Sequence, residues 1–391
     1  MQSPRFAATF VAAGLAVSGT ALATNGMIME GYGPIASGMG GASMAYDNGT
    51  AAMANNPATL GMMPEGGRVD VMLGFVGPDL TVPASPMGSL GASEADAFYM
   101  PAAGYARKQG RFAYGIGIYG QGGMGTEYAN GDMAQVSVGR VIFPLAYTVN
   151  DRFNVGGSVD FVWSGMDLVA DIMPGVPGKE IQFTDDSDFT GEAKGYSLAA
   201  KLGFTYKLSD TLNLGAVYQT ASNLPDLKDG AWKVKGFDMP PVVALGLAWQ
   251  TTDRLMLVAD VKDVLWGSSM NTVTIMNTET GLVVPFQQDW DDQIVVALGL
   301  AYRFTDAFTA RVGYNYGKNP IPDDYVHYLW PATVETHYTA GFGYTLGRRS
   351  TLNFGLSIVP ENTVTGTGPN NAGFVIEHSQ VNWQLMYSHA L

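Results

Sequence analysis

Residues 24–63 read TNGMIMEGYGPIASGMGGASMAYDNGTAAMANNPATLGMM, and the rest of the chain is best understood around this stretch. It holds two acidic residues, Glu30 and Asp47, no Lys or Arg, seven Met and no sustained helical or strand period. A glycine-rich segment with so little charge does not order on its own. We therefore predict that residues 24–67 form a hatch inside an enclosure built by residues 68–391.

The first 23 residues have the features of a cleaved secretory signal. Arg5 is the charged start, Phe6–Val17 is apolar, and Ala21-Leu22-Ala23 fits the small-residue rule for cleavage. An anchoring helix is the alternative, but the apolar run is shorter than the roughly 20 residues that a membrane span needs. We predict that residues 1–23 are a signal peptide and that the chain is exported.

The composition points to β-structure in a membrane. Charged residues make up 14% of the chain and apolar residues 47%, with 50 Gly, 19 Tyr, 18 Phe and 7 Trp. Soluble proteins carry roughly 25% charged residues. The chain has no Cys, which excludes disulfides and thiolate chemistry, and its net charge of −14 argues against nucleic-acid binding.

From Arg68 onward the chain divides into fourteen segments with period-2 alternation, each of about 9–15 residues, the length of tilted membrane strands. The segments are 68–76, 95–107, 111–121, 136–149, 152–166, 194–207, 210–221, 240–250, 253–266, 293–303, 307–316, 336–346, 350–360 and 379–391.

The links between these segments alternate between short and long without exception. The six short links are 108–110, 150–151, 208–209, 251–252, 304–306 and 347–349. The seven long links are 77–94, 122–135, 167–193, 222–239, 267–292, 317–335 and 361–378. Outer-membrane barrels have short periplasmic turns, long outer loops and an even strand number. A soluble β-sandwich, the alternative, gives no reason for this rhythm.

The alternation also has the polarity of a lipid-facing barrel. In 194–207 one face is apolar and the other is small or polar, with Lys201 and Thr205 among its residues. Trp and Tyr residues near the strand ends would suit interfacial girdles. We predict an all-β protein, a 14-stranded antiparallel transmembrane β-barrel with an N-terminal hatch inside the lumen.

Several motifs resemble the FadL/TodX (OmpP1) family of outer-membrane channels for long-chain fatty acids and other hydrophobic molecules. The hatch carries Ser37-Gly38-Met39-Gly40-Gly41-Ala42 and then Asn56-Pro57-Ala58, in an order and spacing similar to the family's. Other similar pieces are VKDVLW at 261–266 and RVGYNYGKNPIP at 311–322. The resemblance implies fourteen strands, and it implies a kink in the third strand that opens the barrel wall sideways. Gly120, Gly122 and Gly123 are the residues that would allow this kink here.

Asn56-Pro57-Ala58 also has a local meaning of its own. Pro57 fixes its own φ and keeps Asn56 out of the α region, while the Asn side chain can bond nearby backbone groups. The sequence predicts a rigid turn there, and its functional interpretation is a hinge or stop that positions the hatch.

The few charges inside the predicted strands all fall on the lumen face. They are Arg140, Asp160, Lys201, Asp260, Lys262 and Arg311. One hypothesis is that Arg140, Lys201 or Arg311 binds the anionic head group of a ligand. The alternative is mutual pairing with Asp160 and Asp260 across the lumen.

The predicted function is passive uptake of hydrophobic molecules, most simply long-chain fatty acids, captured by apolar outer loops such as 282–286 and 325–331. The alternatives are uptake of neutral aromatic hydrocarbons or alkanes, and a polar-solute porin. No Ser/His/acid spacing suggests an enzyme, and we assign no catalytic residues, no cofactor and no metal. Acidic clusters in long links, such as Asp289-Asp291-Asp292, would be solvated or would bind divalent cations shared with lipopolysaccharide. Expected partners are the ligand, outer-membrane lipid and lipopolysaccharide, with the chain as a monomer.

Overall fold

The computed structural model describes residues 25–171, 180–185 and 191–391. The predicted signal peptide and Thr24, the first residue of the predicted hatch, lie outside these residues. The described chain is nearly all β, with one short α-helix and three 3₁₀ turns among twenty strands. No helix in this part of the chain is long and apolar enough to cross a membrane.

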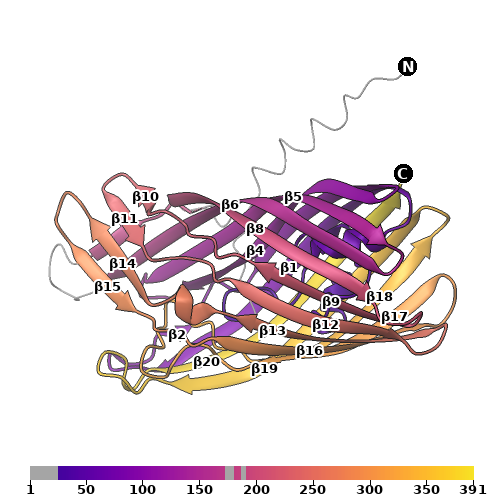
Figure 1. The fold of residues 1–391 in the computed structure, drawn as a ribbon. Helices are drawn as coiled ribbons and strands as arrows, with labels where there is room; N and C mark the ends of the chain where they lie inside the picture. The colour runs from indigo at the N-terminus through magenta and orange to yellow at the C-terminus, as the bar shows by residue number, and fades with distance from the viewer. Residues whose placement is uncertain (1–24, 172–179, 186–190) are drawn as a thin grey trace.

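Fourteen of the strands form a closed antiparallel barrel, because each pairs with its neighbour and the last pairs with the first (Figure 1). In order around the wall they are β1 (Gly66–Ala84), β3 (Phe98–Gln109), β4 (Phe112–Glu127), β5 (Met133–Asn150), β6 (Phe153–Asp171), β8 (Ala193–Lys207), β9 (Leu212–Gln219), β12 (Val242–Gln250), β13 (Leu255–Val264), β16 (Gln293–Arg303), β17 (Phe308–Gly317), β18 (Thr336–Leu346), β19 (Ser350–Thr365) and β20 (Val375–Ala390).

The predicted strand number and closure are confirmed, but several segments predicted as long links are strand. β1 continues to Ala84, and its residues Pro78 and Asp79 pair with Gln380 and Ser379 of β20. Alternation fails as a guide there because strands that leave the bilayer no longer need an apolar outer face, whereas their backbone pairing continues.

Four of the predicted long links, 77–94, 167–193, 222–239 and 267–292, also carry short strands of their own. They are β2 (Gly91–Ala92), β7 (Glu180–Phe183), β10 (Leu227–Asp229), β11 (Trp232–Lys235), β14 (Thr272–Asn277) and β15 (Val283–Gln287), with a 3₁₀ turn at Trp266–Ser268. In Figure 1 the β10–β11 and β14–β15 hairpins extend the barrel at the end opposite the C-terminus. We call this the long-link end.

The two faces of the wall have the predicted polarity. In β8, Leu198 and Leu202 are each 68% exposed on the outside, whereas Lys201 and Thr205 are buried inside. The outer surface is therefore apolar and the inner surface carries the polar groups, as a barrel in hydrocarbon requires.

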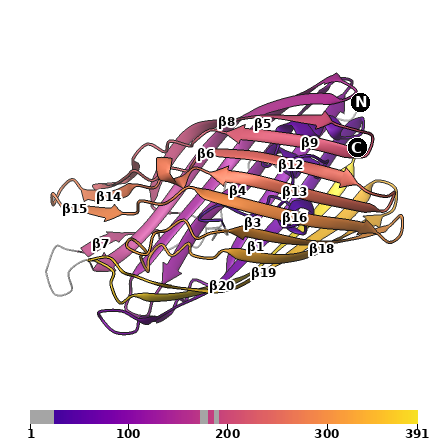
Figure 2. The ribbon, with the colours of Figure 1, turned by 60° about the horizontal axis from the view of Figure 1, so that its bottom comes forward.

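The N-terminal segment, residues 25–63, is largely buried against the inner wall and lies within the ring of strands in both views (Figure 2). The helix α2 (Pro34–Ser37) packs on β18, β19 and β20, and the 3₁₀ turn η1 (Gly49–Met53) packs on β1 and β3. The 3₁₀ turn η2 (Pro57–Met62) packs on β5, β6 and β8. These contacts extend around much of the barrel.

The lipid-facing surface makes a first prediction. Leu202→Arg, in the second half of β8, should lower the free energy of unfolding in lipid vesicles by up to about 2–4 kcal/mol, because an Arg there enters hydrocarbon. Urea titration of the protein refolded into vesicles measures the loss. Leu208→Arg is the control, since Leu208 lies in the turn after β8 and should tolerate the charge. Equal effects of both variants would contradict the assignment of this face to lipid.

Candidate functional site

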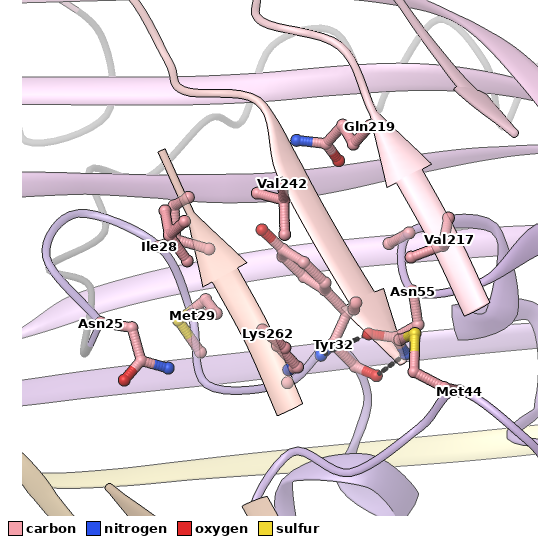
Figure 3. A pocket seen from close by; sticks show the side chains of 14 residues that line it. Asn25, Ile28, Met29, Tyr32, Met44, Asn55, Val217, Gln219, Val242 and Lys262 are labelled. Atoms are coloured by element: carbon pink, nitrogen blue, oxygen red, sulfur yellow. Dashed lines mark hydrogen bonds between the residues drawn. The ribbon is translucent and has the colours of Figure 1, made fainter. Parts of the chain in front are cut away.

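Three small cavities lie between the N-terminal segment and the inner wall. The largest, cavity 1, has a volume of about 50 Å³, which admits a few water molecules. Figure 3 shows its lining, in which β9, β12 and β13 face the N-terminal segment. Its apolar side chains are Ile28, Met29, Met44, Ala54, Val217, Val242, Ala244 and Val264, and its polar ones are Asn25, Tyr32, Asn55, Gln219 and Lys262.

Cavity 2 lies against β3 and β4, and its lining includes Met29, Met72, Met100 and Gly120. Methionine side chains adapt their shape to apolar contacts. Cavity 3 is smaller and reaches Arg140 and Lys201. Tyr32 lines all three cavities, so one residue is in contact with each of these spaces.

Beside cavity 2 the barrel wall is incomplete. Pairing between β3 and β4 ends at Ala103 and Ile118, although both strands continue. Farther along, the backbone N–H of Glu94 donates to the carbonyl oxygen of Glu127 at 2.8 Å. We call the unpaired interval between these two points the window. It has β3 residues 98–102 on one side and β4 residues from Tyr119 onward on the other.

The glycines predicted to kink the third strand lie along the window. The β4–β5 register shifts between Gly120 and Gly122, so Gln121 is an extra residue in β4 with no partner in β5. This is a β-bulge, which bends a strand and interrupts its pairing. Gly123 follows the bulge and pairs with Ser137.

The N-terminal segment meets β4 at the bulge. Ile28 forms an isolated antiparallel bridge with Gly122, on the side that β3 leaves open. A side chain at Gly122 would overlap the carbonyl oxygen of Met27, so only glycine permits this approach. The hydroxyl of Tyr32 donates to the carbonyl oxygen of Gln121 at 2.7 Å. The segment thus supplies hydrogen bonds that β3 does not.

The turn at Asn56-Pro57-Ala58 has the predicted local geometry. Asn56 is extended, its side chain accepts a hydrogen bond from the N–H of Ala58, and Pro57 begins η2. The Asn56 amide also donates to the carbonyl oxygens of Met44 at 2.8 Å and Phe204 of β8 at 3.2 Å. The turn is therefore fastened to the wall, and its role as a hinge or stop stays a prediction.

Arg140 and Lys201, two of the three predicted ligand-binding cations, come together on Asp160. The same carboxylate oxygen lies 2.8 Å from Nη1 of Arg140 and 2.7 Å from Nζ of Lys201. The guanidinium of Arg140 also donates to Gln121 at the bulge and to Ser222. Both cations therefore already pair with the carboxylate of Asp160. Pairing with a lumen carboxylate is the alternative to ligand binding given in the sequence analysis.

Arg311, the third predicted cation, lies apart from this cluster. Its guanidinium donates to Oδ1 of Asn353 at 3.2 Å, and it lines none of the three cavities. Ligand binding by these three cations therefore remains a hypothesis, with only Arg140 and Lys201 next to a cavity.

Lys262 is a cation that the sequence places in the lumen but that was not among the three predicted ligand-binding residues. Its Nζ donates to the carbonyl oxygens of Glu30 at 2.8 Å and Gly41 at 3.1 Å, and the side chain lines cavity 1. In the described chain no carboxylate lies within ion-pair distance of this ammonium. Asp260 instead accepts the N–H groups of Ser43 and Met44. The alternation of β13 marks both side chains as inward, but only the position of the N-terminal segment separates their roles.

The apolar loops predicted to capture ligand pack largely on one another at the long-link end. Trp330 and Tyr328 are buried, and Phe286 meets the rings of His327 and Trp330 edge-on. Burial lowers the pKa of His327 to about 4, so its imidazole is neutral at physiological pH. The hydroxyl of Tyr328 donates to Asp132 in the β4–β5 turn at 2.9 Å. Link 317–335 is thereby tied to the β4–β5 hairpin.

The acidic clusters give no metal centre in the described chain, where no three His, Asp or Glu side chains are grouped closely enough to hold an ion.

Comparison with known proteins extends these observations. A family model described as outer membrane protein transport protein (OMPP1/FadL/TodX) matches residues 10–385. The toluene transporter TbuX of Ralstonia pickettii is 28% identical with a TM-score of 0.76, covering 93% of this chain and 99% of its own. The toluene transporter TodX of Pseudomonas putida is 26% identical with a TM-score of 0.79, at the same coverage of 93% and 99%.

Two further proteins are similar either in fold alone or over a short stretch of sequence alone. A FadL homologue of Pseudomonas aeruginosa is 16% identical with a TM-score of 0.74, covers 93% of this chain and 99% of its own, and shares the fold. An uncharacterised Chlorobium limicola protein in the phosphoenolpyruvate carboxykinase gene 5′ region is 61% identical over 46 residues, which is 12% of this chain and 23% of that protein.

The ion cluster makes a prediction about stability. Asp160→Asn should destabilise the barrel by about 3–5 kcal/mol, because it leaves the buried Arg140 and Lys201 charges without an anion. Urea unfolding in vesicles measures this. The control Asp210→Asn breaks the exposed pair of Asp210 with Lys207 and should leave stability unchanged. If Asp160→Asn is as stable as the control, Asp160 is not what holds the two cations.

Proposed function

The chain belongs to the outer membrane transport proteins of the OMPP1/FadL/TodX family, and we propose that its substrates are small neutral hydrocarbons of the monoaromatic class. Members of this family are channels for hydrophobic compounds in the outer membrane, not enzymes. What remains to be assigned is the molecule that passes and the route that it takes.

The observation that carries the proposal is the chain of cavities from cavity 1, past Tyr32, to cavity 2 at the window. Apolar side chains dominate the lining, and the only charged side chain in cavities 1 and 2 is Lys262. Sites for small apolar ligands are concave, mostly apolar and equipped with few polar groups. The two toluene transporters, both above 25% identity, add support for a monoaromatic substrate.

The proposed route has three stages. A hydrophobic molecule is captured by apolar side chains of the outer loops and enters the lumen at the long-link end. The N-terminal segment acts as a hatch that blocks a straight aqueous path, so the molecule moves along its apolar contacts. It leaves sideways through the window between β3 and β4 into the membrane.

Fatty acids are the second candidate because of Lys262. An ammonium has three donors, and two of those on Lys262 are used by the carbonyl oxygens of Glu30 and Gly41. The third is available to a carboxylate in cavity 1. This single residue separates the two substrate classes.

Uptake by cells that lack their own transporter tests the substrate. We expect labelled toluene to enter faster with this protein than without it, and Lys262→Met to leave that rate within about twofold. If long-chain fatty acids are also taken up, their rate should fall about tenfold or more in Lys262→Met. Lys207→Met, at the end of β8, is the control for loss of a lysine. Heat-modifiable gel mobility confirms assembly, and no uptake of toluene by assembled protein would refute the proposal.

Removal of the bulge tests the route. Deleting Gln121 takes out the extra residue, so β4 can pair regularly with β5 and approach β3. We expect toluene uptake to fall close to the level without protein. Gln121→Ala, which keeps the bulge but loses the side-chain bond to Arg140, should retain most uptake. If the deletion transports normally, the molecule leaves by another path.

A further inference from the structure

Tyr32 holds an unusual position, because it is the one residue common to the linings of all three cavities. Met29 borders cavities 1 and 2, and Ala54 borders cavities 1 and 3, but neither reaches all of them. Tyr32 therefore contacts all three of these spaces, and between cavities 1 and 2 it shares this position with Met29.

The backbone around Tyr32 is fixed, so its side chain is the part that can move. The amide of Asn55 forms two hydrogen bonds with the Tyr32 backbone, drawn in Figure 3, at 3.3 and 2.9 Å. Gln384 of β20 bonds the residues on either side, accepting from the N–H of Gly33 at 2.8 Å and donating to the carbonyl of Gly31 at 3.0 Å. Rotation about the side-chain bonds needs none of these contacts to break.

The ring is held at its outer end by the bulge. Its hydroxyl donates to the carbonyl oxygen of Gln121, the residue that has no partner in β5 and lies beyond the last β3–β4 pair. In an apolar interior an unpaired carbonyl is unfavourable, so this bond favours one position of the ring. It also couples the ring to the strand that borders the window.

We propose that Tyr32 is the gate between the entry cavity and the window, and that its hydrogen bond to Gln121 is the latch. This inference rests on the proposed route. An apolar molecule that fills cavity 1 displaces the ring, breaks the latch and joins cavity 1 to cavity 2. When the molecule has passed, the ring returns because the Gln121 carbonyl again needs its donor.

Tyr32→Phe tests the latch, since it removes the hydroxyl and keeps the ring. A typical net hydrogen bond of 0.5–1.5 kcal/mol corresponds to a shift of roughly 2- to 12-fold in the equilibrium between closed and open ring positions. We expect the initial rate of toluene uptake per assembled barrel to rise within that range.

Tyr46→Phe is the matched control. Its hydroxyl also donates to a carbonyl inside the N-terminal segment, that of Ala42 at 2.6 Å, but Tyr46 lines none of the three cavities. It should leave uptake unchanged. If Tyr32→Phe and Tyr46→Phe behave alike, whether both are inert or both accelerate uptake, there is no latch at Tyr32.

Tyr32→Ala tests the gate by size. Removing the ring joins the cavities permanently, so the ratio of uptake for a bulkier aromatic, such as naphthalene, to that for toluene should rise several-fold over wild type. A ratio equal to that of wild type would overturn a selective role for the ring.

Hydrogen exchange gives a readout that does not depend on the substrate. In purified protein, Tyr32→Phe should accelerate amide exchange in peptides spanning 25–33 and 119–125, and Tyr46→Phe should not accelerate it at 119–125. If the wild-type protein does not take up toluene but the exchange pattern is as expected, the proposed substrate is wrong and the hydrogen bond between Tyr32 and Gln121 still acts as the latch. Unchanged exchange at 119–125 would refute the latch even if toluene is transported.

Discussion

The structure depends on the requirement that every backbone N–H and C=O facing hydrocarbon has a hydrogen-bond partner. Pairing between neighbours, closed by β20 on β1, meets this requirement for nearly the whole wall. The interval between β3 and β4 beyond Ala103 and Ile118 is one place where two neighbouring wall strands do not pair. There the N-terminal segment supplies partners, through the Ile28–Gly122 bridge and the Tyr32 hydroxyl. The segment therefore provides some of the missing partners on the β4 side of the window as well as occupying the lumen, which links its position to any opening of the window.

Glycine in the wall is what allows the segment to lie so close. Several inward-facing strand glycines have no room for a side chain, because the segment occupies the space: a Cβ at Gly156 would lie 2.6 Å from Ala58, and one at Gly313 would overlap the backbone nitrogen of Gly40. A Cβ at Gly215 would overlap the carbonyl of Met44. Glycine weakens a strand, so its repeated use here trades some strand stability for backbone-to-backbone contact. Much of the high glycine content thus reflects contact between two parts of one chain.

The strands and the faces of their side chains follow from the sequence, since lipid outside and polar groups inside impose period 2 over nine or more residues. The strand ends, such as Pro78 and Asp79, could not be predicted from the sequence. Outside the bilayer the alternation of apolar and polar residues is no longer required, and backbone pairing alone sets the strand length. The partners of the lumen charges were only partly predictable. Arg140, Asp160 and Lys201 lie on three successive strands, so their pairing is open to inference. Lys262 and Tyr32 gain their roles from the path of a segment with no period, which sequence patterns do not describe.

The buried charges indicate which movement of the N-terminal segment has the lower free-energy cost. Asp260 accepts from Ser43 and Met44, Lys262 donates to Glu30 and Gly41, and Asp70 accepts from the amide and hydroxyl of Thr50. Withdrawal of the whole segment would break all of these hydrogen bonds. Asp70 would keep its ion pair with Arg68 at 2.8 Å, but Asp260 and Lys262 would lose these partners, and an uncompensated buried charge costs several kcal/mol. Displacing a single ring whose backbone stays anchored costs one neutral hydrogen bond, about 1 kcal/mol. Passage by side-chain displacement, with the segment in place, is therefore the less costly way for a small molecule to cross this barrel.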